Sequence, residues 1–128
     1  MVDAGFALYV GEDSPETLSK LKGPYSDLLK RQVKDPNVAL LLAAAIHLDE
    51  IAQNESSSIF DKSQDPEALV ADELIGMSIA EYIAGKRGLF NYARYDREKP
   101  GILADLPPFL DDAVAALVGA TMTRLFEE

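Results

Sequence analysis

The sequence predicts an all-α fold, a compact bundle of about five to six helices with buried apolar central helices. The chain has 128 residues, of which 48% are hydrophobic, so we expect a single domain over residues 1–128 with a real core. Side chains that cap helices stand directly before a proline at Ser14, Asp35 and Asp65, and proline suits the first helical position. Alternation of Val, Ile and aromatic residues long enough for a sheet is missing.

The N-terminal half predicts three helical segments. A first helix is expected to begin at Pro15, and a shorter amphipathic one to cover residues 26–33. Residues 6–10 could form a short extended segment. A further helix is expected from about Asp35 to a break near Asn54, and it should be central and buried because it is apolar nearly all round.

The C-terminal half predicts two more helices. After a polar loop at residues 54–58, one helix is expected to open at Asp65 and to end at Gly85. The last is expected over residues 109–126, directly after two consecutive prolines, and it is rich in Ala, Val and Leu. Both should bury an apolar face.

Composition excludes several classes of function. The chain has no Cys, so a disulfide scaffold, a thiolate nucleophile or a sulfur-ligated zinc or iron site is impossible. Its net charge of −10 should repel nucleic acid and anionic lipid surfaces. The longest apolar run, residues 38–46, is about half of what a membrane span requires, and the N-terminus lacks a signal segment. We therefore expect a cytoplasmic protein with no transmembrane segment and no nucleic-acid partner.

Three pairs of adjacent acids lie inside or beside the most apolar stretches. They are Asp49 and Glu50, Asp72 and Glu73, and Asp111 and Asp112. Burial of an ionised carboxylate without a partner costs several kcal/mol or more, so the pairs are expected to converge on a cation. Oxygen ligands with no Cys and a single His favour magnesium, manganese or calcium over zinc. The alternative is that most of these acids are simply solvated.

Helix positions sharpen this expectation. Asp72 and Glu73 are expected about two turns into their helix, too far in to act as caps. Asp49 lies near the end of its helix, where the dipole disfavours acids, whereas the dipole does favour Asp111 and Asp112. Adjacent residues point about 100° apart, so one of these last two should face inward.

Other residues have two interpretations each. Gly76 could leave room for a ligand at Asp72 or for a neighbouring helix. Residues 91–101 could be a surface loop with salt bridges, or an anion site in which Lys99 and Arg94 meet a phosphate. His47 lies in an apolar run and is expected to be a core or rim residue rather than a ligand.

Four motifs with ordered spacing resemble those of the phosphatidylglycerophosphatase A superfamily. In chain order they are Asp65-Pro66; Val70-Ala71-Asp72-Glu73 with Gly76; Tyr95-Asp96 with Lys99-Pro100; and Leu110-Asp111-Asp112 with Ala115. Residues 33–36 and 48–52 are similar to its soluble, helical branch. The resemblance implies a magnesium-dependent phosphatase that acts on a phosphomonoester.

The resemblance also implies the site residues. By matching position they are Asp72, Glu73, Asp96, Lys99, Asp111 and Asp112. We expect one or two Mg²⁺ ions, with Mn²⁺ as a substitute. The metal ligands are expected to be Asp49, Asp72, Glu73, Asp111 and Asp112, and the catalytic residues Asp72, Asp96, Lys99 and Asp112. Lys99 would stabilise charge on the phosphoryl oxygens, while Asp96 would orient Lys99, complete the metal site or protonate the leaving oxygen.

The implied substrate depends on the branch. The membrane enzymes act on phosphatidylglycerol phosphate, and an archaeal soluble branch is similar to alpha-ribazole 5′-phosphate phosphatase of cobamide synthesis. This chain lacks membrane spans and has Ala93 where the membrane enzymes have Arg, which favours the small soluble substrate. Two alternatives remain: a non-catalytic helical domain that binds metal or phosphate, and an oligomerisation module in which apolar helices meet in a homo-oligomer.

Overall fold

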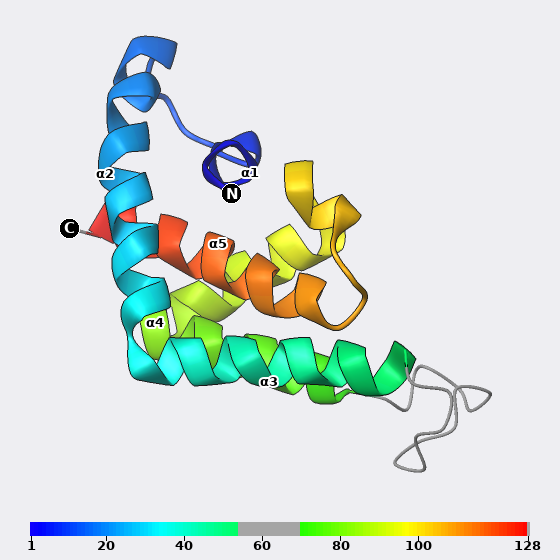
Figure 1. Cartoon of the computed structure of the whole chain (residues 1–128). Coiled ribbons are helices and arrows are strands. Elements are labelled where there is room, and N and C mark those ends of the chain that lie inside the picture. Colours follow the sequence, from blue (N-terminus) through cyan, green and yellow to red (C-terminus); the bar gives the residue numbers. More distant parts are fainter. Residues whose placement is uncertain (54–69, 128) are drawn as a thin grey trace.

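The computed structural model describes residues 1–53 and 70–127, and this part of the chain is helical without a strand (Figure 1). The predicted all-α fold is confirmed. The elements in order are α1 (Val2–Ala7), α2 (Pro15–Lys34), α3 (Pro36–Gln53), α4 (Ala71–Glu98), a 3-10 helix η2 (Gly101–Asp105) and α5 (Leu110–Glu127). The predicted loop at 54–58 and the predicted helix start at Asp65 lie outside the described residues.

The centre of the bundle is α5. It contacts each of the other four α-helices, and nearly every residue from Asp112 to Met122 is buried. Small residues such as Ala116 and Ala120 let the neighbouring helices approach closely, so α5 is covered on all sides. Figure 1 shows it enclosed by the other elements.

The predicted helix at 35–54 is confirmed as α3, but its predicted central, buried position is wrong. Among its residues only Val38, Ala45 and Asp49 are buried, whereas Leu40 is 70% exposed and Ile46 46% exposed. Within one copy of the chain, α3 packs along the outside of the bundle with one face (Figure 1). Apolar character all round therefore did not predict which helix is enclosed.

The N-terminal third differs from expectation in two places. The two segments predicted from Pro15 and over 26–33 form the single helix α2, which continues through the exposed Pro24. The extended segment predicted at 6–10 is wrong. Residues up to Ala7 are helical, and Phe6 packs edge-on against Tyr25 with ring centroids 5.5 Å apart.

A glycine divides α4 into two halves. Gly85 has a φ of 64°, a conformation that side-chain-bearing residues rarely adopt. The helix that was predicted to end at Gly85 therefore has a kink at this residue and continues beyond it. A second helical half then runs to Glu98, so the interpretation of residues 91–101 as a loop is wrong up to that point. The chain breaks at Pro100 and Gly101 as predicted.

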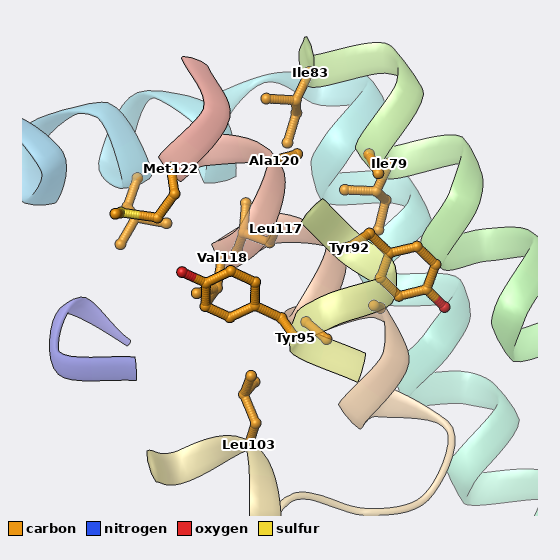
Figure 2. Packing of buried hydrophobic residues seen from close by; sticks show 14 of the residues in the cluster. Ile79, Ile83, Tyr92, Tyr95, Leu103, Leu117, Val118, Ala120 and Met122 are labelled. Carbon is orange, nitrogen blue, oxygen red and sulfur yellow. The ribbon is translucent and has the colours of Figure 1, made fainter. Parts of the chain in front are cut away.

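Opposite faces of the second half of α4 pack against different parts of the molecule. Figure 2 shows Tyr92 and Tyr95 leaving this helix in opposite directions. The hydroxyl of Tyr95 donates to the carbonyl of Gly5 in α1, while Tyr92 packs toward Gly76 in the first half of α4. No helix within the described residues is long and apolar enough to cross a membrane.

Candidate functional site

Three carboxylates meet where the end of α4 approaches the start of α5. Asp96, Asp111 and Asp112 each offer an oxygen within 4.8 Å of the others. Asp112 is buried and Asp111 half-buried, which confirms that at least one of this adjacent pair faces inward. We call these three residues, together with the nearby Asp72, the acid cluster.

Lys99 lies in the middle of the acid cluster. Its Nζ is 3.0 Å from Asp112 Oδ1 and 3.3 Å from Asp111 Oδ1, and it also contacts Asp96. Lys99 ends α4 with a φ of 47°, the left-handed conformation. Such conformations cost on the order of 1 kcal/mol outside glycine and gather at functional sites.

The cluster has more negative than positive charge. Burial raises the pKa of Asp96 and of Asp112 above the ordinary value, and Lys99 opposes the rise in both. The closeness of Asp112 raises the pKa of Asp96 further, whereas for Asp112 the hydrogen bond with Asp96 lowers the pKa and the one with Asp72 raises it. For Lys99, burial acts to lower the pKa, but its bonds to Asp96 and Asp112 raise it above the ordinary value. One ammonium therefore serves three or more carboxylates, and the excess negative charge would be relieved by a cation.

Asp72 approaches the cluster from the other half of α4. A hydrogen bond between its carboxyl group and that of Asp112 contributes to the raised pKa of Asp112, after burial. The prediction that Asp72 and Glu73 lie two turns into a helix is wrong, because α4 begins at Ala71 and both acids are in its first turn. Glu73 is exposed and lines, together with Asp96 and Tyr92, the cavity beside the cluster.

Asp49, a predicted metal ligand, has other partners. Its side chain is 5% exposed, and its two oxygens accept hydrogen bonds from the backbone N–H of Phe109 (2.9 Å) and of Leu110 (2.8 Å). It therefore caps the N-terminus of α5 from a different helix, which explains an acid at the unfavourable end of α3. Asp49 holds in place the turn that carries Asp111 and Asp112.

The rest of the first acid pair faces solvent. Glu50 is exposed and lies 3.5 Å from His47, which is itself exposed rather than in the core. The expectation that all three acid pairs converge is therefore wrong for Asp49 and Glu50, whereas Asp72, Asp111 and Asp112 come together with Asp96.

Tyr92 is a site residue that sequence reasoning missed. Its hydroxyl is buried and has no hydrogen-bond partner within the described part of the chain. Burial first, and then the charges of the acid cluster and Glu73, raise the pKa of Tyr92, so the phenol stays protonated. Because Tyr92 precedes Asp96 by four residues, recognition of the helix over 86–98 would have placed both on one face.

Gly76 makes room for this tyrosine. A Cβ at Gly76 would come within 2.5 Å of the Tyr92 hydroxyl and 3.2 Å of the Asp112 carbonyl oxygen. The space at Gly76 is therefore taken by a packed side chain, which supports the packing interpretation of this glycine. Through that packing the Tyr92 hydroxyl reaches the acid cluster.

Arg94 faces away from the acid cluster. Its guanidinium donates to Asn91 Oδ1 (2.8 Å) and to the carbonyl of Leu8. The predicted pairing of Arg94 with Lys99 on one phosphate is therefore wrong. Among the described residues, Lys99 is the basic residue whose side chain contacts the acid cluster.

The donors present fit a hard divalent cation. All are oxygens. The Tyr92 hydroxyl is buried without a hydrogen-bond partner in the part that the structure describes, whereas Asp111 Oδ1 is paired with the Lys99 ammonium at 3.3 Å. Mg²⁺ and Mn²⁺ prefer carboxylate and water oxygens. Unpartnered buried oxygen atoms are costly unless a ligand completes them.

Comparisons with known proteins show the family of this chain. A family model described as "Phosphatidylglycerophosphatase A" matches residues 5–127. The chain is 40% identical to "Uncharacterized protein MJ1330" of Methanocaldococcus jannaschii, over 98% of this chain and 100% of that protein. It is 34% identical to "Uncharacterized protein YutG" of Bacillus subtilis, over 77% of this chain and 62% of that protein. No solved structure matches.

Proposed function

The chain belongs to the phosphatidylglycerophosphatase A family, and from that membership we propose that it is a magnesium-dependent phosphatase of a small phosphomonoester. The observation that carries the proposal is the acid cluster, in which Asp96, Asp111 and Asp112 surround a single ammonium. A half-buried excess of negative charge is the environment that a divalent cation stabilises and a phosphate then shares.

Four carboxylates would hold the cation. Asp111 and Asp112 supply oxygens from the first turn of α5, Asp96 from the end of α4, and Asp72 from the start of α4. Bound there, Mg²⁺ or Mn²⁺ would neutralise phosphate charge and lower the pKa of a water molecule. Asp49 contributes indirectly, because it fixes the first turn of α5.

Two donors would act on the phosphate. Lys99 has three N–H donors and a positive charge that can pair with phosphoryl oxygens once its carboxylate partners are neutralised. Its contact with Asp96 orients the ammonium. Tyr92 remains protonated and can donate a hydrogen bond to an oxygen that develops charge during transfer.

The substrate would have an apolar part. A cavity of about 310 Å³ adjoins Asp96, with Met77, Leu89 and Ala93 among its lining residues. Leu89 and Ala93 also line a neighbouring hollow of about 360 Å³ that extends toward Phe90. This apolar surface supports a phosphomonoester with a flat organic group, such as alpha-ribazole 5′-phosphate of cobamide synthesis. The alternative, phosphatidylglycerol phosphate, would place lipid on the same surface.

Phosphate release tests the proposal. The panel is alpha-ribazole 5′-phosphate, glycerol 3-phosphate and phosphatidylglycerol phosphate in mixed micelles, each assayed with Mg²⁺, with Mn²⁺ and with chelator. We expect metal-dependent release, greatest for the ribazole ester, abolished in Asp112→Asn and retained in the matched surface variant Glu50→Gln. Absence of release from every ester by the wild-type chain, while Mn²⁺ binds, would favour the non-catalytic alternative instead.

One observation favours a further role in assembly. The side of α3 that carries Leu40 and Ile46 is exposed in a single copy and bears the polar pair His47 and Glu50 as well, and exposed apolar side chains of this kind often meet in homodimers. The homo-oligomer remains a prediction, which sedimentation of the wild type and of Leu40→Glu tests. Assembly would replace the phosphatase proposal only if the wild-type chain bound no divalent metal.

A further inference from the structure

A second cavity lies on the side of α4 that faces away from the acid cluster. It has a volume of about 410 Å³ and is bordered by residues 8–10 directly after α1, the second half of α4 and the end of α5. With 3.6 residues per turn, Asn91 and Arg94 point roughly opposite to Asp96. The divergence of Tyr92 and Tyr95 in Figure 2 shows the same division of this helix. The phosphatase proposal therefore makes no use of this α1–α5 cavity.

One wall of the α1–α5 cavity carries a guanidinium fixed by a chain of hydrogen bonds. Asn91 Nδ2 donates to Gly119 O (2.9 Å) and to Thr123 Oγ1 (3.1 Å), and Asn91 Oδ1 accepts from Arg94 (2.8 Å). A second nitrogen of Arg94 donates to the carbonyl of Leu8. Of the five N–H donors of a guanidinium, these two bonds leave three without a protein partner within the described residues. Arg94 is thus held in one orientation before any ligand arrives.

The cavity is positive in a strongly acidic protein. Arg94 and Arg87 both line it, and the one acid among its lining residues, Glu127, lies 3.6 Å from Arg87. The lining side chains themselves have an excess of one positive charge, and the hydroxyl of Tyr9 in the lining donates to Asp13 just outside it, whereas the whole chain has a net charge of −10. A cavity of this sign attracts anions that the rest of the surface repels.

Apolar groups flank the fixed guanidinium. The rings of Tyr9 and Phe126 lie with centroids 5.5 Å apart, and both line the cavity. Val10, also in the lining, is 80% exposed. Apolar side chains left in water beside an oriented cation match a molecule that carries both an apolar body and an anionic group.

We propose that the α1–α5 cavity binds an amphipathic organic anion, a carboxylate or phosphate carried on a flat or aliphatic body. The anionic group would form a bidentate pair with the free N–H donors of Arg94. The body would cover Tyr9, Phe126 and Val10 and remove their apolar surface from water. The volume lies within the range of small-molecule sites.

Titration of the full chain with two matched probes tests this proposal by ¹H–¹⁵N correlation spectroscopy. The probes are naphthalene-2-carboxylate and the uncharged naphthalene-2-methanol, which has the same ring body. We expect saturable shifts around Asn91 and Thr123 for the carboxylate, with a dissociation constant of about 1 mM or tighter. The alcohol should bind at least about tenfold more weakly, because it lacks the charged pair with Arg94.

Two variants with equal charge change supply the control. Val10→Glu puts a carboxylate on the cavity wall and leaves the hydrogen bonds that hold Arg94 in place. It should weaken the binding of naphthalene-2-carboxylate about tenfold. Val33→Glu adds the same charge at an exposed position of α2 outside the cavity lining and should leave binding unchanged. Equal affinity of the two probes, equal binding by the two variants, or shifts centred on the acid cluster would overturn the proposal.

Discussion

The replacement of Asp49 tests whether this acid is a cap or a metal ligand. Its two oxygens accept hydrogen bonds from the backbone N–H groups of Phe109 and Leu110 at the start of α5. A hydrogen bond to a charged group contributes about 1.5–3 kcal/mol. Asp49→Asn keeps one carbonyl oxygen and loses the charge and one of the two bonds. The free energy of unfolding should therefore fall by about 2–3 kcal/mol.

This loss is large enough to measure by urea unfolding and by thermal melting. For a domain of this size, 1 kcal/mol corresponds to about 3–5 °C, so the melting temperature should fall by about 6–15 °C. The decisive comparison is with and without magnesium. Because the role assigned here is a cap, the loss should be the same in both conditions.

A neighbouring acid supplies the control. Glu50→Gln removes the adjacent carboxylate, which is exposed and pairs with the exposed His47, and it should change stability by less than about 0.5 kcal/mol. A loss in Asp49→Asn below about 0.5 kcal/mol would refute the capping role. A loss that appears only with magnesium present would return Asp49 to the metal site.

The remaining predictions concern the acid cluster. Lys99→Gln should lower the free energy of unfolding without metal by about 1–2 kcal/mol, because the carboxylates lose their ammonium partner. Thermal melts should show that magnesium restores most of the lost stability, and a loss that magnesium does not reduce would contradict the role of Lys99. Tyr92→Phe should lower kcat about tenfold with stability unchanged or raised, since its hydroxyl has no hydrogen-bond partner in the described part. Tyr95→Phe is the matched control: it loses the hydrogen bond to Gly5, so stability should fall by about 1 kcal/mol while kcat stays unchanged. An equal fall of kcat in the two variants would count against a role of the Tyr92 hydroxyl in catalysis. Folding raises the pKa of Asp96 above its ordinary value of 3.8, so between these two pKa values the metal-free folded chain binds more protons than the unfolded chain. The free energy of unfolding should therefore fall as the pH rises from 3.8 through the raised pKa of Asp96. Chemical unfolding at several pH values should show this slope in the wild type and a smaller one in Asp96→Asn.

Local signals in the sequence predicted much of the fold. A capping residue before proline located the starts of α2 and α3, and Gly85 located the kink in α4, because these positions depend on backbone chemistry within a few residues. The short α1 carried no such signal. Its position depends on contacts such as that between Phe6 and Tyr25, which are distant in sequence.

Tertiary arrangement explains what sequence reasoning missed. Both α3 and α5 are apolar, and only the packing decides that α5 is enclosed while Leu40 of α3 is exposed. Likewise, Asp111 and Asp112 were recognised from their place in one helix, but the partner of Asp49 lies 60 residues further along the chain. The role of Tyr92 required knowing that residues 86–98 continue as a helix beyond Gly85.

Binding of Mn²⁺, followed by electron paramagnetic resonance, tests the central claim most directly. If Asp96, Asp111 and Asp112 share a cation, the wild type should take up Mn²⁺ saturably, Mg²⁺ should compete for it, and Asp112→Asn should lose it while Glu50→Gln keeps it. Unchanged uptake by Asp112→Asn, or no saturable uptake by the wild type, would contradict the assignment of these carboxylates to a metal site.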